Sequence, residues 1–347
     1  TIDSDDASTK RDLTLTLGSG TASISDAVGS TSLADITLNS DATFNSTLVA
    51  DNLTIAASKT GTVKDSVTIG STITLNNSSV LAIENTTAIT IAGTIAEDSG
   101  SATETKITVK FATADTDASK VTISGTVTVD TLHVGDQSAA LFSGYADFTG
   151  SGGATIGTMV VTSGDHANEY STLQFNYAVT SSNGITINDK NDTAYQAYLI
   201  FAGNNTATIA SDIIVADNEG TLKVTGTGKT FTGTIGTSAD ALELIDIDVA
   251  TTFNNAVYTS DLEVDGAIGT SGTSSISVSE TSAIGADVTT SGTQTYTGAV
   301  TLSADVTLTT TNSNATFSST IDSDDASTKR DLTLTLGSGS ASVTGIV

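Results

Sequence analysis

The stretch TIDSDDASTKRDLTLTLGSG runs from Thr1 to Gly20, and the same twenty residues run again from Thr320 to Gly339. One period of the sequence therefore spans residues 1–319. Beyond the identical block the copies differ only mildly, since Thr21-Ala22-Ser23-Ile24 becomes Ser340-Ala341-Ser342-Val343. Neighbouring copies of one long repeat typically differ in this way. We interpret the chain as one period followed by the start of the next, and we expect it to be an excerpt of a longer polypeptide.

Inside this long period lies a shorter one, in which aliphatic residues alternate with threonine. The alternation starts in the block at Leu13 and returns at Ile36, Leu53, Ile73 and Ile89. Shorter segments alternate in the same way between these starts, at residues 22–24, 42–44 and 67–69. The pattern predicts an all-β, elongated parallel β-solenoid. We expect about 20 residues per turn, two or three short strands in each turn, and roughly sixteen turns in one period.

The unit of two aliphatic residues around one threonine also predicts which side chains are buried. Alternate side chains of a strand point to opposite faces, so both aliphatic side chains enter a narrow core and the β-branched hydroxyl faces water. The chain contains no proline, as expected if every inner strand donates its backbone N–H groups to the next turn.

Composition and charge exclude several classes of protein. The 39 acidic and 12 basic residues give a net charge of −27, which would repel nucleic-acid phosphates and anionic lipids. Nothing in the sequence is apolar for long enough to predict a membrane-spanning helix. The absence of cysteine excludes disulfides and thiolate metal sites, and it suits an exported bacterial protein.

One section departs from the short period. Nine of the 16 aromatic residues lie between about Leu141 and Phe201. We divide the chain into solenoid turns at 1–140, an aromatic-rich insertion or widened turns at 141–201, further turns at 202–319, and the start of the next repeat at 320–347. The aromatic residues either fill a locally wider core or form a lateral contact or ligand surface. The candidate surface residues are Tyr145, Tyr170, Tyr177, Tyr195 and Tyr198.

Acidic residues recur at the predicted corners and suggest one cofactor, Ca²⁺. Carboxylates this close together supply the oxygen ligands that Ca²⁺ prefers, although neither a β-roll nonapeptide nor an EF-hand loop is present. Solvated corners without metal are the alternative interpretation. The candidate ligands are Asp3, Asp5, Asp6, Asp115, Asp117, Asp322, Asp324 and Asp325, and Asp189 and Asp192 flank Lys190 in a similar corner.

Catalysis is not predicted. The segment Gly226–Thr230 imitates the end of a phosphate-binding loop, but it lacks the first glycine and precedes a strand, so we predict no nucleotide. The best pair of carboxylates is Asp246 and Asp248, on one face of a strand and close to Glu243. No Lys, Arg or His falls between Lys229 and Lys329 to support them.

The stretches DLTLTLGSGTASISDAVGS, ATFNSTLVADNLTI and TQTYTGAVTLSADVTL resemble the repeat regions of giant bacterial surface proteins of the filamentous-haemagglutinin and autotransporter-adhesin kind. The resemblance implies a secreted, right-handed β-solenoid with a structural or adhesive role at the cell surface or outside the cell. It supplies no catalytic residues.

We therefore expect a structural repeat module of a long extracellular filament or stalk, with adhesion to a glycan or other cell-surface ligand as an adjacent role. The expected partners are copies of the same module, joined end to end or through lateral filament contacts. The alternatives are a surface-layer subunit and, less favoured, a β-helix enzyme acting on carbohydrate. Because the block at the start of the chain is repeated near its end as though another period followed, we also expect turns to pass from module to module without a break.

Overall fold

The computed structural model describes residues 2–6, 8–85, 87–98, 104–111, 119–135, 143–163, 169–189, 195–216, 218–269 and 274–345. These residues form short β-strands and turns, with no α-helix among them. The described part of the chain accordingly contains no helix long and apolar enough to cross a membrane.

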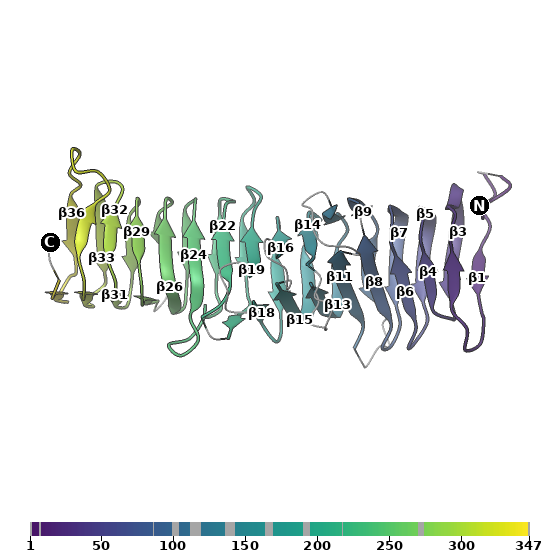
Figure 1. The fold of residues 1–347 in the computed structure, drawn as a ribbon, viewed down its shortest axis with the longest axis horizontal. Helices are drawn as coiled ribbons and strands as arrows, with labels where there is room; N and C mark the ends of the chain where they lie inside the picture. The colour runs from purple at the N-terminus through teal and green to yellow at the C-terminus, as the bar shows by residue number, and fades with distance from the viewer. Residues whose placement is uncertain are drawn as a thin grey trace. The chain divides into compact units, whose positions relative to one another are not determined.

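The chain divides into two compact units, and each is described by itself. The first consists of residues 1–183 and 192–196, and the second of residues 184–191 and 197–347. In Figure 1 the first runs from purple to teal and the second from teal to yellow.

The first unit contains seventeen named strands among its described residues. In chain order they are β1 (Leu13–Leu15), β2 (Ala22–Ile24), β3 (Val28–Leu38), β4 (Ala42–Phe44), β5 (Leu48–Ile55), β6 (Thr60–Val63), β7 (Val67–Leu75), β8 (Val80–Asn85), β9 (Ile89–Ile91), β10 (Thr94–Glu97), β11 (Lys106–Phe111), β12 (Val121–Ile123), β13 (Val127–Val134), β14 (Tyr145–Phe148), β15 (Ala154–Thr162), β16 (Glu169–Phe175) and β17 (Val179–Ser181).

The remaining named strands lie wholly or mostly in the second unit. They are β18 (Ile185–Asn188), β19 (Tyr195–Phe201), β20 (Ala207–Ile209), β21 (Ile213–Val215), β22 (Thr221–Val224), β23 (Lys229–Phe231), β24 (Leu242–Ile247), β25 (Thr251–Phe253), β26 (Val257–Val264), β27 (Ile268–Gly269), β28 (Ile276–Val278), β29 (Ser282–Ile284), β30 (Val288–Thr290), β31 (Gln294–Tyr296), β32 (Val300–Leu302), β33 (Val306–Thr310), β34 (Ala315–Phe317), β35 (Ile321–Ser323), β36 (Leu332–Thr335) and β37 (Ala341–Val343).

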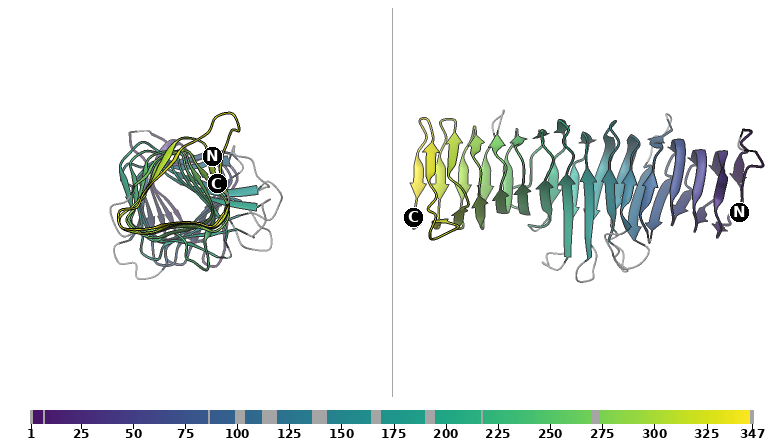
Figure 2. Two further views of the ribbon diagram at one scale, coloured as in Figure 1. Left: turned by 90° about the vertical axis from the view of Figure 1, so that its left-hand side faces the viewer. Right: turned by 90° about the horizontal axis from the view of Figure 1, so that it is seen from above.

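Each unit winds through three stacks of parallel strands, so that each strand pairs with its counterpart one turn earlier and one turn later. In the first unit, for example, β2 pairs with β4, β4 with β6, and β6 with β8. In the second unit β26 pairs with β29, β29 with β32, and β32 with β35. The strands of a stack point the same way (Figure 2). The prediction of an all-β parallel β-solenoid is confirmed, while its right-handedness stays a prediction.

The core of each unit is a column of aliphatic side chains, as the alternation predicted. Ile36 and Leu38 in β3 are fully buried, and Thr37 between them is partly exposed. Their counterparts one turn later, Leu53 and Ile55, are buried too. Each fully buried aliphatic side chain contributes about 1.5–3 kcal/mol relative to an exposed one.

The predicted length of a turn was too short. The structure has about 23 residues per turn and about 13 turns, rather than 20 and sixteen. One of the expected starts, Ile89, belongs to a different stack, in which it pairs with Val121. The partner of Ile73 in its own stack is Ile95, which lies in β10. Ile95 in turn pairs with Val127, so this turn is much longer than the one before it.

Candidate functional site: the repeated acidic loop

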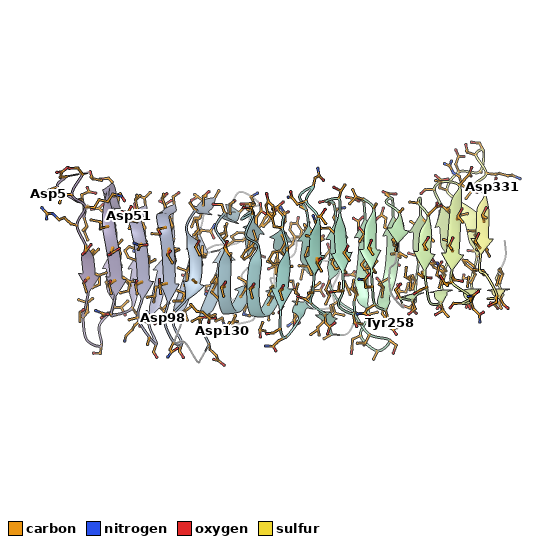
Figure 3. All side chains as sticks on the ribbon, turned by 180° about the vertical axis from the view of Figure 1, so that it is seen from behind. Asp5, Asp51, Asp98, Asp130, Tyr258 and Asp331 are labelled. Atoms are coloured by element: carbon orange, nitrogen blue, oxygen red, sulfur yellow. The ribbon has the colours of Figure 1, made fainter. Side chains whose placement is uncertain are left out.

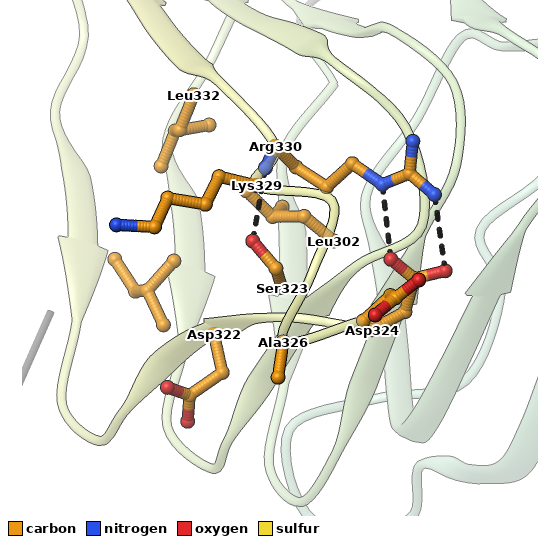
Figure 4. A pocket seen from close by; sticks show the side chains of 10 residues that line it. Leu302, Asp322, Ser323, Asp324, Ala326, Lys329, Arg330 and Leu332 are labelled. Atoms are coloured by element: carbon orange, nitrogen blue, oxygen red, sulfur yellow. Dashed lines mark hydrogen bonds and ion pairs between the residues drawn. The ribbon is translucent and has the colours of Figure 1, made fainter.

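The most distinctive polar feature is the loop inside the repeated block, which folds in nearly the same way in both copies. In the first copy Arg11 donates from Nε to Asp5 Oδ1 at 3.0 Å and from Nη2 to Asp5 Oδ2 at 3.4 Å. In the second copy Arg330 donates to Asp324 through the same atoms at 2.9 and 3.3 Å (Figure 4). This two-point geometry holds the two ends of the loop together.

A second set of contacts within the loop is also repeated. The backbone N–H of Ser8 donates to Asp6 Oδ1 at 2.8 Å, and that of Ser327 donates to Asp325 Oδ1 at 2.7 Å. The hydroxyl groups of both serines donate to the same carboxylates. An aspartate that accepts a backbone N–H two residues later forms a local turn, so the sequence of the loop dictates this part of its shape.

These contacts lower the pKa of the loop carboxyl groups. The hydrogen bonds and charge of Arg11 lower the pKa of Asp5, and Arg330 does the same for Asp324. Hydrogen bonds from Ser8 lower the pKa of Asp6. All three carboxyl groups are therefore ionised at neutral pH.

The first copy also reaches the following turns. Ser30 Oγ donates to Asp3 Oδ2 at 2.6 Å, and the backbone N–H of Thr31 donates to Asp3 Oδ1 at 3.0 Å. Lys10 forms an ion pair with Asp51, two turns further along. Figure 3 places Asp5 and Asp51 at the same edge of the first unit.

The Ca²⁺ prediction gains no support from this geometry and stays a prediction. Asp3, Asp5 and Asp6 each accept hydrogen bonds, from Ser30, Arg11 and Ser8 respectively. Among the described residues, no group of three or more His, Cys, Asp and Glu side chains is placed to hold a metal ion. Asp115, Asp117, Lys190 and Asp192 lie outside the described residues.

The neighbouring candidate Asp189 is buried in the second unit. Its backbone N–H donates to Glu219 Oε2 at 2.9 Å, and its Oδ2 accepts the backbone N–H of Gly220 at 2.8 Å. These bonds join one turn to the next, which is a structural role.

The carboxylate pair considered for catalysis forms a salt-bridge network. Lys223 pairs with Asp246, and its Nζ lies 3.3 Å from Asp248 Oδ2. Lys223 and Asp246 are directly opposite in the register of β22 and β24. Burial raises the pKa of Asp246 even though Lys223 acts in the other direction, and burial also raises the pKa of nearby Glu263. The ammonium group that contacts both Asp246 and Asp248 therefore belongs to Lys223, one turn earlier in the chain.

The candidate surface tyrosines are not presented as one exposed cluster. Tyr145 is partly buried and its hydroxyl group donates to Gln174 Oε1 at 3.1 Å, whereas Tyr170 is exposed. Tyr177 in the first unit and Tyr198 in the second are partly buried. The side chain of Tyr195 lies outside the described residues. The prediction of a ligand surface stays a prediction.

Other aromatic residues pack in the core. In the first unit the rings of Phe148 and Phe175 stack with centroids 5.0 Å apart. In the second unit Phe231 packs between Phe201 and Phe253, at 5.0 and 5.1 Å. Such pairs add about 0.5–1.5 kcal/mol to the effect of area burial.

Sequence reasoning missed the role of Lys229, in the segment that imitates a phosphate-binding loop. Lys229 is 1% exposed, and its Nζ donates to the backbone oxygens of Gly203, Asn205 and Thr227 at 2.6, 2.8 and 3.3 Å. Burial lowers its pKa. The signal was its place in the alternation, two residues before the inward-facing Phe231. Lys229 thus satisfies carbonyl groups at a corner instead of facing a ligand.

The chain matches no protein-family description, no curated protein and no solved structure. The resemblance to filamentous-haemagglutinin and autotransporter-adhesin repeats therefore rests on the quoted stretches alone.

Proposed function

We propose that this chain is a structural repeat module of a long extracellular bacterial filament or stalk, in which β-solenoid turns continue from one module to the next. The observation that carries the proposal is the repeated block. Its two identical copies, one period apart, form the same loop with the same Asp–Arg pair and the same local turn. A long chain of such modules gains length by repeating one stable unit, since each turn contacts mainly its neighbours.

Charge and chemistry support a structural role. The net charge of −27 favours mutual repulsion between neighbouring fibres, which keeps them dispersed. Asp246 and Asp248, the best acid pair in the sequence, are both engaged by Lys223. The adhesive role is an extension of this proposal, with the exposed Tyr170 as its first residue to test.

Electron microscopy of the native material tests the proposal. We expect fibres whose subunits repeat along the fibre axis. Planar sheets would contradict the filament and favour a surface-layer subunit. Release of reducing sugars or unsaturated products from polysaccharides, lost on Asp246→Asn substitution, would contradict a purely structural role.

A further inference from the structure

The first copy of the block is bonded to the turn that follows it. The backbone N–H of Gly29 donates to Ile2 O at 2.7 Å, and the N–H of Ser4 donates to Thr31 O at 3.4 Å. Further along, the N–H of Ala34 donates to Arg11 O at 2.9 Å. Together with the Asp3 and Lys10 contacts described above, these bonds attach the first copy of the block to residues 28–51.

The second copy is bonded to the turn that precedes it. The N–H of Asp324 donates to Leu302 O at 2.9 Å, and the N–H of Asp331 donates to Asp305 Oδ1 at 2.9 Å. The N–H of Val306 donates to Asp331 O at 3.0 Å. The second copy therefore uses the opposite side of the block.

The two sets of bonds use different atoms of the block. The first copy engages the N–H of Ser4, whose counterpart is Ser323, whereas the second copy engages the N–H of Asp324. In a parallel sheet successive residues of a strand bond to opposite neighbours, so this alternation is expected. One copy of the block can thus hold a preceding and a following turn at the same time.

The side of the second copy that corresponds to the bonded side of the first carries two exposed charged side chains without a partner among the described residues. Asp322 and Lys329 are the counterparts of Asp3 and Lys10. Among the described residues, neither side chain has an ion-pair or hydrogen-bond partner. Beside them lies a cavity of about 820 Å³ whose apolar lining includes Leu302, Ile321 and Leu332 (Figure 4).

The occupant that fits this surface is already present in the first unit. Ser30 and Asp51 supply the donor and the acid that bind the first copy. Val28 and Leu33 of the same segment are apolar and only 1% and 2% exposed. The cavity is also lined by Asp324, Asp325 and Arg330, which are engaged within the loop. Its apolar residues and the side chains of Asp322 and Lys329 therefore have matching partners in this segment.

We propose that the open side of the second copy, defined by Ile321, Asp322, Lys329 and Leu332, binds a segment with the sequence of residues 28–55, in register with the period that begins at Thr320. The inference rests on the proposed function. The contact between the second copy and this segment, called the junction below, is where one module would continue into the next. The appended Ser30 would donate to Asp322, and the appended Asp51 would pair with Lys329. The segment's apolar residues would fill the cavity.

A chain extended by this segment, which completes one turn and begins the next, tests the junction. Residues 29–55 are appended after Val347, which stands where Val28 stands in the period. Amide hydrogen exchange is then compared with that of the 347-residue chain. We expect the amides of Ile321, Ser323 and Leu336 to exchange at least about tenfold more slowly in the extended chain, because their counterparts are bonded to the following turn in the first copy.

The amides of Asp324 and Asp331 are the internal control, because their bonds to the preceding turn are present in both chains. An appended segment of the same composition in scrambled order should give no slowing. In the extended chain, Lys329→Glu should remove part of the protection, and an aspartate-to-lysine change at the appended Asp51 should restore it.

Unchanged exchange at Ile321, Ser323 and Leu336 would overturn the junction, whether the appended turn folds elsewhere or stays unprotected. Fibres of the native protein together with such a result would retain the filament and reject this junction. Planar sheets of the native protein together with slowed exchange would reject the filament and retain the junction.

Discussion

The two copies of the block have one sequence and the same principal contacts within the loop, yet they contact the rest of the chain through opposite sides. The Asp–Arg pair and the Asp–Ser turn are the same in both. The contacts of Asp3 and Lys10 in the first copy have no equivalent at Asp322 and Lys329 among the described residues. The comparison separates what the loop sequence dictates from what the neighbouring turns supply.

The largest expected effect comes from removing the core beneath the second copy. Phe317 is 1% exposed, stacks on Tyr296 at 5.2 Å and pairs in register with Val343, just beyond the block. Phe317→Ala should lower the unfolding free energy of the second unit by about 3–5 kcal/mol, because it leaves a cavity. Chemical denaturation followed by circular dichroism measures the loss, and Phe317→Leu should recover most of it. A loss below about 1 kcal/mol would show that the second copy does not depend on this turn.

A glycine pair gives the sharpest contrast between the copies. A Cβ atom on Gly339 would lie 2.0 Å from the backbone oxygen of Ser313, whereas on Gly20 its nearest neighbour would be Leu17 O at 3.3 Å. Gly339→Ala should therefore cost about 1–3 kcal/mol through overpacking. Gly20→Ala should be close to neutral. Equal losses of unfolding free energy in the two variants would contradict the different surroundings of the two copies.

The ion pair between turns should give a smaller difference. Lys10 and Asp51 are each about one-third exposed or more, at 32% and 42%, so Lys10→Met should cost about 0.5 kcal/mol. Lys329→Met should cost nothing in the 347-residue chain. Thermal unfolding of both variants in low and high salt measures these losses. High salt should abolish the stability difference between Lys10→Met and the parent chain, because it screens the ion pair.

The loop's own ion pair should behave alike in both copies. Arg11→Gln and Arg330→Gln should raise the pKa of Asp5 and Asp324 toward the ordinary aspartate value, because the guanidinium groups lower them. A lowered carboxyl pKa favours the folded loop above the unfolded pKa, and this contribution disappears as the pH falls through the folded pKa. Carbon-detected NMR titration of the carboxyl groups measures the shift. A shift in one copy alone would show that the pair depends on neighbouring turns.

The alternating residues predicted strands and inward side chains well, because a period of two fixes the face of every residue. Ile36, Leu38, Leu53 and Ile55 are buried as expected. The length of a turn was not predictable from the first strands, since a solenoid tolerates corners of very different length. The long turn between the paired residues Ile95 and Val127 illustrates this.

Contacts between turns were harder to predict than the strands. The pair between Lys223 and Asp246 requires the register of β22 against β24, which the sequence does not state directly. The carbonyl acceptors of Lys229 come from the preceding corner and from its own. In contrast, the contacts between Asp6 and Ser8 and between Asp325 and Ser327 depend only on residues two apart.

Residue-resolved hydrogen exchange of the 347-residue chain tests the central claim most directly. In the first copy, the amides of Ile2 and Ser4 should be protected and those of Asp5 and Asp12 should exchange freely. In the second copy the pattern should be reversed, with Asp324 and Asp331 protected and Ile321 and Ser323 exchanging freely. Opposite patterns in two identical sequences would establish that each copy is bonded on one side and open on the other. The same pattern in both copies would contradict the account.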